Sequence, residues 1–230
     1  MSRQRSLGMR DLKLAFESSN PSGWPSGRNS YTDPITGLIQ FGEDPQGYVG
    51  TCAFLAAAPD NLMVWNDKNH TSTWRFYDMF GNETLITVNN YRPVADYSSP
   101  GRLGIAEKAA GKALERFGLV EPGKTAWQEI TDGNAAADML AITTGRRFTN
   151  GHVDVLTAGY LASLGAEDII VWTGQGRELA ASHGYRVTGI GANTITFYNP
   201  WLKQLNRPGA YITLSDVELQ SEGSFGIAYG

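Results

Sequence analysis

The single cysteine of this chain, Cys52, lies where a nucleophile could be activated. It follows the loop Gln46-Gly-Tyr-Val-Gly-Thr-Cys52 and opens an apolar run, residues 53–58, that we expect to be helical. A thiol in the first turn of a helix lies near free backbone N–H groups and the positive end of the helix dipole, which favour thiolate over thiol. The thiolate is the reactive form, so this position suits a nucleophile. The alternative is that Cys52 is a small buried apolar residue.

A thiol nucleophile needs a base and a group that orients the base. Among the three histidines, His183 begins a strand-like run, and Asn199 ends the next such run across a turn. In a hairpin the two side chains can meet, and the asparagine oxygen can accept a ring N–H and hold the tautomer. We expect His70 to lie in a solvated loop and His152 at a helix start near the surface. The alternative is that His183 is a satisfied interior group and Asn199 a turn residue.

Two further residues complete the candidate site. The amide of Gln46 could point at the oxygen of an attacked carbonyl and, with the backbone N–H of Cys52, form a two-donor oxyanion hole. Trp201 closely follows Asn199 and could cover the His–Asn hydrogen bond, although a core tryptophan would give the same pattern. The thiol and the histidines have no metal-ligand spacing, so we predict no metal site. No cofactor is predicted either.

Composition excludes several classes of function. The chain has 230 residues, of which 41% are hydrophobic and 18% charged, enough for one sizeable core or two packed lobes. A net charge of −4 without a basic stripe argues against a nucleic-acid partner. One cysteine allows no intramolecular disulfide. No apolar window is long enough to span a membrane, and the N-terminus lacks the apolar stretch of a signal peptide. We therefore expect a soluble, cytoplasmic protein, with non-classical export left open.

Apolar periodicity and turn residues predict the elements that position these groups. Helices are expected at 51–58, 103–117, 135–143 and 153–164, and strands at 71–80, 83–89, 169–172, 184–190, 194–198, 210–214 and 226–229. Residues 18–35 are dense in turn formers and should lack regular structure. Helices dominate the first two thirds and strands the last third, which indicates an α+β protein of two lobes.

Three motifs resemble those of the calpain family of papain-like cysteine proteases. The family pattern Gln-Gly-x-x-Gly-Asp/Asn-Cys is similar to the loop that ends at Cys52. The family motif Gly-His-Ala-Tyr-x-Val is similar to Ser182-His183-Gly-Tyr-Arg-Val187, and Asn-Pro-Trp-Gly is similar to Asn199-Pro-Trp201-Leu202. Weaker likeness lies between the motifs, so that the resemblance covers roughly residues 40–215.

The resemblance implies a papain-like two-lobe fold, with a helical lobe carrying the cysteine and a β-rich lobe carrying the histidine and asparagine. Residues 1–40 would be an irregular N-terminal arm, and 41–230 the protease core, with lobes at about 41–165 and 166–230. The implied activity is hydrolysis of peptide bonds in a protein or peptide substrate.

The resemblance also implies a role for each site residue. Cys52 would be the nucleophile, His183 the general acid/base, Asn199 its orienter and Gln46 the oxyanion donor. Two further residues are implied at the substrate cleft: Gly133 through its backbone, and Trp201 as a shield.

The chain departs from the family pattern at several positions. They are Thr51 for Asp or Asn, Ser182 for Gly, Leu202 for Gly, Asp132 for the first residue of a Gly pair, and Pro59 within a helix that normally runs longer. The acidic loops that bind calcium in animal calpain cores are not matched, so calcium dependence is not predicted. Two alternatives stay open: another acyl transfer by the same triad, as in a deamidase, transglutaminase or ligase, and a catalytically silent binding module. The arm could be a strap over the cleft, a pro-segment or a docking tail.

Overall fold

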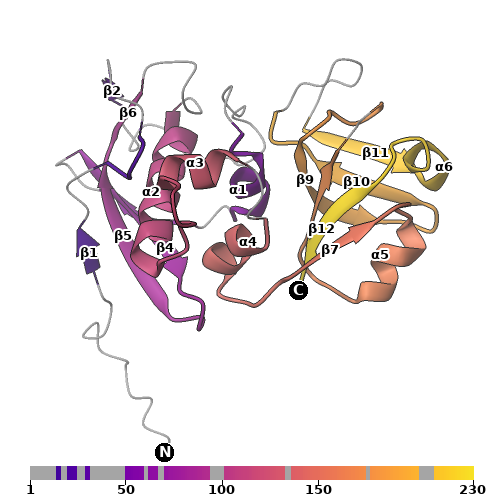
Figure 1. Cartoon of the computed structure of the whole chain (residues 1–230), viewed down its shortest axis with the longest axis horizontal. Coiled ribbons are helices and arrows are strands. Elements are labelled where there is room, and N and C mark those ends of the chain that lie inside the picture. Colours follow the sequence, from indigo (N-terminus) through magenta and orange to yellow (C-terminus); the bar gives the residue numbers. More distant parts are fainter. Residues whose placement is uncertain are drawn as a thin grey trace, which may run out of the picture.

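The computed structural model describes residues 14–16, 20–24, 29–31, 50–59, 62–66, 70–93, 101–132, 136–174, 177–201 and 210–230. Over these residues the protein is mixed α and β, with two main sheets and a group of helices between them (Figure 1). The predicted mixture of helices and strands is thus confirmed. No helix in the described ranges is long and apolar enough to cross a membrane.

The first sheet has four strands in the order β1-β5-β4-β3. They are β1 (Leu14–Phe16), β3 (Met63–Asn66), β4 (Thr71–Tyr77) and β5 (Glu83–Asn89). The predicted hairpin of β4 and β5 is present, and Asp78 Oδ1 ends β4 by accepting the backbone N–H groups of Phe80 and Asn82, each at 2.9 Å. This aspartate closes the turn, so the strand stops before residue 80, its predicted end.

Four helices lie between the sheets: α1 (Cys52–Ala57), α2 (Gly101–Phe117), α3 (Ala126–Thr131) and α4 (Ala136–Thr144). Every residue of α1 is buried, as its apolar sequence requires. Ala58 turns to an extended conformation (ψ 124°) because the residue before a proline is disfavoured in the helical region, so Pro59 sets the end of α1. Three of these helices were predicted, and α3 was missed. Its capping box, Thr125 with Gln128, was the available signal.

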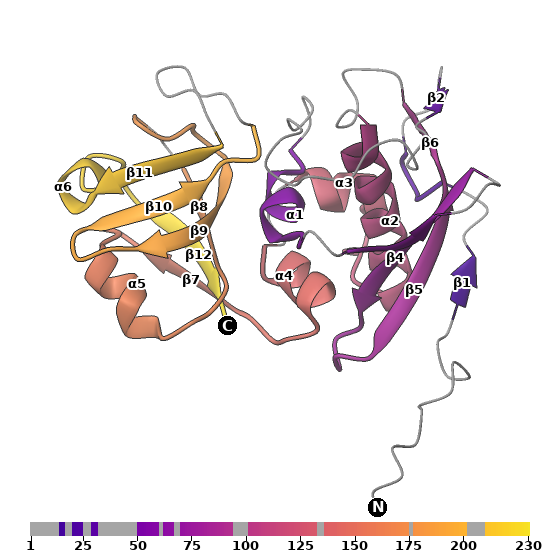
Figure 2. The same ribbon diagram turned by 180° about the vertical axis from the view of Figure 1, so that it is seen from behind.

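The second sheet has six antiparallel strands in the order β11-β10-β9-β8-β12-β7. They are β7 (Thr149–Val153), β8 (Ile169–Thr173), β9 (Gly184–Ile190), β10 (Thr194–Tyr198), β11 (Tyr211–Ser215) and β12 (Phe225–Tyr229). One face packs on α1 and α4, and the other carries α5 (Ala158–Leu164) and α6 (Asp216–Leu219) (Figure 2). The five strands predicted for this region are confirmed to within one residue at each end.

Two sequence predictions are wrong. The helix expected at 153–164 begins only at Ala158, where the hydroxyl of Thr157 caps the N–H of Tyr160, and residues 149–153 form the edge strand β7. Residues 18–35 were expected to be irregular, but β2 (Asn29–Tyr31) pairs with β6 (Tyr91–Pro93). Both strands depend on partners distant in the chain, which local periodicity does not reveal. The strand β1 also lies within the arm that was expected to be irregular.

Candidate active site

Cys52 is the first residue of α1, and its position is fixed by contacts on both sides of the preceding loop. The buried hydroxyl of Thr51 donates to Glu107 Oε1 of α2 at 2.7 Å. A Cβ built on Gly50 would lie 2.0 Å from the carbonyl oxygen of Thr131 at the end of α3, so only glycine fits there. Thr51 therefore ties the loop to α2, and Gly50 allows the loop to approach the end of α3 closely.

His183 and Asn199 are brought together by the hairpin of β9 and β10. His183 immediately precedes β9 and Asn199 follows β10, so antiparallel pairing puts both at the same end of the sheet. The His183 Nε2 atom lies 2.9 Å from Asn199 Oδ1, and both side chains are buried. The contact expected from the sequence is present.

The backbone N–H of Trp201 also donates to Asn199 Oδ1, at 3.0 Å. A backbone N–H is only a donor, so this atom of Asn199 must be the carbonyl oxygen. His183 Nε2 must then carry a proton, and Nδ1 of the neutral ring has a free lone pair. Nδ1 is itself buried and has no hydrogen-bond partner among the described residues. The ring is therefore held as a base whose accepting nitrogen is unoccupied.

Aromatic rings fix the plane of the imidazole. Trp201 stacks on His183 with ring centroids 4.2 Å apart and planes 23° apart, as expected for a ring that covers the His–Asn pair. Tyr185 meets the imidazole edge-on, with centroids 4.7 Å apart. The Tyr185 hydroxyl accepts the N–H of Ala180 at 2.8 Å, which holds that ring in turn. With its side chain enclosed, His183 is only 1% exposed.

The thiol lies against the strand that follows His183. The backbone N–H of Gly184 donates to Cys52 Sγ at 3.3 Å. A Cβ on Gly184 would lie 3.4 Å from the Ala53 nitrogen, so an alanine would also fit there. Cys52 and His183 line one cavity of about 300 Å³, together with Ala53, Asp132, Ala136, Ile170, Trp172, Thr173, Gly174, Ser182 and Gly184. The thiol and the histidine thus belong to the wall of a single cavity.

Burial dominates the titration of both groups. It raises the pKa of the Cys52 thiol, against the opposing hydrogen bonds from the backbone N–H groups of Gly184, Ala53 and Cys52 itself. It also lowers the pKa of His183 to about 4, against the opposing hydrogen bond to Asn199. Both shifts favour a thiol and an uncharged imidazole at neutral pH. The expectation that the start of the helix makes Cys52 anionic is contradicted, because desolvation outweighs what this short helix supplies.

Glu222 is a buried residue that holds the segment before His183, and the sequence did not indicate it. Its carboxylate accepts the backbone N–H groups of Arg177, Glu178 and Leu179, at 2.8, 2.6 and 3.2 Å. The segment it holds leads into His183, whose N–H and carbonyl bond to Thr173 on β8. Because Glu222 lies far along the chain from the loop it binds, no local pattern could have found it.

Two predicted site residues, Gln46 and Gly133, lie outside the described residues. His152 is exposed as expected, but it lies in β7 and not at a helix start. His70 is exposed, as predicted for a loop residue. The described residues contain no group of three side chains that could hold a metal ion.

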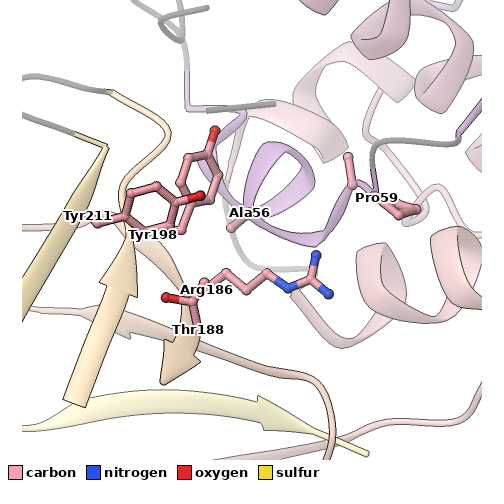
Figure 3. Close-up of a pocket in the computed structure, with 7 residues that line it drawn as sticks. Ala56, Pro59, Arg186, Thr188, Tyr198 and Tyr211 are labelled. Carbon is pink, nitrogen blue, oxygen red and sulfur yellow. The ribbon is translucent and has the colours of Figure 1, made fainter. Parts of the chain in front are cut away.

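A second cavity, of about 310 Å³, lies at the other end of α1. Figure 3 shows Arg186 reaching across it, with the rings of Tyr198 and Tyr211 near Ala56. The remaining lining residues are Ala58, Pro59 and Thr188. None of the residues in this lining is a cysteine, histidine or carboxylate, so the cavity at Cys52 is the candidate site.

The chain matches no protein-family model and no curated protein. The geometry of the cavity at Cys52 is therefore the evidence for its class of function.

Proposed function

We propose that the protein is a cysteine endopeptidase that uses Cys52, His183 and Asn199 as a catalytic triad. The observation that carries the proposal is the orientation of the histidine: two donors on Asn199 Oδ1 leave Nδ1 of His183 as a free, buried base. Such a base shares a cavity with the only cysteine, and it could take the thiol proton once the two side chains come within hydrogen-bond reach, since no hydrogen bond joins Nδ1 to the thiol here.

The arrangement of elements supports a papain-like, two-lobe organisation, but with the second lobe beginning near β7 and not at residue 166, because β7 and α5 belong with the six-stranded sheet. The thiol comes from α1, within the group of helices, whereas the histidine and the asparagine come from the six-stranded sheet. A cavity lined from both sides lies where these parts meet. A substrate bound there would contact both parts at once.

In the proposed reaction, His183 Nδ1 takes the thiol proton as Cys52 Sγ attacks the carbonyl carbon of the peptide bond. The oxyanion would be bound by the Cys52 backbone N–H and the Gln46 amide. The imidazolium gives its proton to the leaving amine, the C–N bond breaks, and a thioester remains. Water then attacks the thioester while His183 takes its proton, and the thiol and the acid product are released. Asn199 holds the ring in position throughout.

The raised pKa of Cys52 and the lowered pKa of His183 define the resting state of this proposal. A neutral pair must transfer its proton during the attack, or after substrate changes the surroundings of the cavity. The same two shifts favour the second candidate, a catalytically silent papain-like module. Such a module would have a thiol, 6% exposed in this structure, that does not react near neutral pH.

The test is labelling by an iodoacetamide probe together with cleavage of a denatured protein. We expect labelling that Cys52→Ala abolishes, and cleavage that is lost with Cys52→Ala. Asn199→Ala should lower kcat by roughly 10²-fold or more, in the range for loss of general acid–base function. His152→Gln, which changes an exposed histidine, is the matched control and should leave the rate unchanged. Labelling without any cleavage would favour another acyl transfer, which ammonia or a cross-linked product would identify. Indifference of Cys52 to the probe at neutral pH would favour the silent module.

A further inference from the structure

The cavity at Cys52 has one fixed charge in its wall. Among the described residues that line it, Asp132 is the only one with a carboxylate, and none is a lysine or an arginine. The Asp132 side chain is 43% exposed, and the residue lies at the end of α3. The described lining therefore includes one acidic residue and no lysine or arginine to oppose it.

Negative charge is in excess around Asp132. Lys124 Nζ lies 3.1 Å from Asp132 Oδ2, but the same amine also contacts Glu121 at 2.9 Å and Glu129 at 4.0 Å. One cation is thus shared by three carboxylates. Burial, and then Glu129 and Glu121, raise the pKa of Asp138 on the adjacent helix, as expected where negative charge is in excess. The cluster leaves Asp132 able to attract a second cation.

The rest of the wall is apolar and aromatic. Ile170 and Trp172 project from the face of β8 that meets the helices, and Ala136 lies opposite on α4. Trp172 is held tightly, because a Cβ on Gly226 would come within 1.8 Å of its ring. An apolar wall with an indole and a carboxylate suits a long aliphatic side chain that ends in a cation, through packing and cation–π attraction.

We propose that this cavity selects substrates with a lysine or arginine side chain beside the bond that is cleaved, and that Asp132 determines the selection. This inference depends on the proposed function for its biological meaning. A second observation points to the same cavity as a ligand site: His183, 1% exposed, has an unpartnered Nδ1 within its lining.

The first experiment compares peptides that differ only in arginine or citrulline at each of the two residues on the acyl side of the cleaved bond. Citrulline has the same shape without the charge. We expect kcat/KM to be about fivefold higher for arginine at one of these positions, the range of a solvent-accessible ion pair. Asp132→Asn should bring the ratio to about one, whereas Lys124→Met, which frees the carboxylate, should raise it. A structural defect would lower both rates and leave the ratio unchanged.

The control for this experiment is Asp154→Asn, which makes the same change at a side chain that is 94% exposed and outside the cavity lining. The ratio in this variant should equal that of the unmodified protein. A ratio of one or below in the unmodified protein, or a preference for arginine that survives Asp132→Asn, would overturn the inference. The proposed peptidase function would stand in each of these cases.

The second experiment needs no turnover. Alkylation of Cys52 by 2-bromoethylamine, which is cationic, is compared with alkylation by the anion iodoacetate. Each rate is divided by that of free cysteine. In both reactions an S–C bond forms, halide leaves and the thiol proton goes to solvent. The cationic reagent should be favoured about fivefold, and Asp132→Asn should remove the preference. Charge-selective alkylation without cleavage of any peptide would contradict the proposed peptidase function but support the preference of the cavity for cations. Equal relative rates for both reagents would contradict that preference.

Discussion

Ser182 has a left-handed backbone conformation, with φ at 52°, directly before His183. The family motif that this segment resembles has glycine at the same position, and glycine enters this region without a steric cost. For a serine this conformation costs about 1 kcal/mol. The Ser182 side chain is exposed and lines the cavity at Cys52. Ser182 therefore adds a small strain at the turn, while the imidazole of His183 keeps its hydrogen bond to Asn199.

The titration of His183 gives a prediction at the scale of one residue. The folded protein lowers its pKa from 6.5 to about 4, so between these values the unfolded chain binds a proton that the folded chain does not. Stability contributed by the neutral ring is present above pH 6.5 and falls as the pH is lowered through this window. Over the window the free energy of unfolding should fall by roughly 3 kcal/mol more than in His183→Gln.

The measurement is urea denaturation at several pH values from 4 to 7. His152→Gln changes an exposed histidine and should keep the pH dependence of the unmodified protein. Identical slopes in the His183→Gln variant and the unmodified protein would show that His183 does not titrate as described.

The segment between β8 and β9 is positioned by contacts with other elements. Glu222, which follows α6, accepts three successive backbone N–H groups of this segment, and its side chain is buried. Tyr185 and Thr173 bond to the same segment at Ala180. Backbone donors that are buried without a partner are costly, so this carboxylate orders the entry into His183.

We predict that Glu222→Gln lowers the free energy of unfolding by about 1–3 kcal/mol, because a neutral amide with one acceptor oxygen replaces a carboxylate that serves three donors. Hydrogen exchange at the amides of residues 177–179 should accelerate. Glu83→Gln is the control, since Glu83 forms a partly exposed pair with Arg75 and such pairs contribute little. Unchanged protection of the three amides would contradict the proposed anchoring.

At the scale of the whole molecule, one carboxylate joins the helices to the six-stranded sheet. Asp168, directly before β8, pairs with Arg146 after α4 and with Arg186 on β9. Its side chain is 13% exposed, so solvent screens these contacts less than at an open surface. The bridge lies on the side of the molecule where Arg186 also lines the second cavity.

We predict that Asp168→Asn lowers the free energy of unfolding by about 1–2 kcal/mol, because two arginines lose a shared anion. The loss should be smaller at 1 M salt, where screening weakens the pairs. Arg146 also pairs with Glu167, whose side chain is 83% exposed. Glu167→Gln should therefore lower the free energy of unfolding by less than about 0.5 kcal/mol. Chemical denaturation of both variants at low and high salt is the measurement. A loss that does not depend on salt would exclude the electrostatic account.

Much of the fold could be predicted from local pattern. The strands β8 to β12 and the helices α1, α2 and α4 have apolar residues at the period of their structure or in buried runs, and their ends have turn residues or a proline. The elements that the sequence did not predict are short, and they have little or no apolar periodicity of their own. β2 and β7 are short strands that depend on pairing with β6 and β12, and α3 has only six residues.

The sequence by itself determined the types of the chemical groups and the order of the elements that bring them: one thiol opening a helix, then a histidine and an asparagine at the ends of paired strands. Only the tertiary structure decided that Asp132 lines the cavity at Cys52, that Glu222 anchors the segment before His183, and that burial raises the pKa of Cys52 and lowers that of His183. The physical reason is that residue type and periodicity act over neighbouring residues, whereas desolvation and contacts between distant segments exist only after the chain has packed.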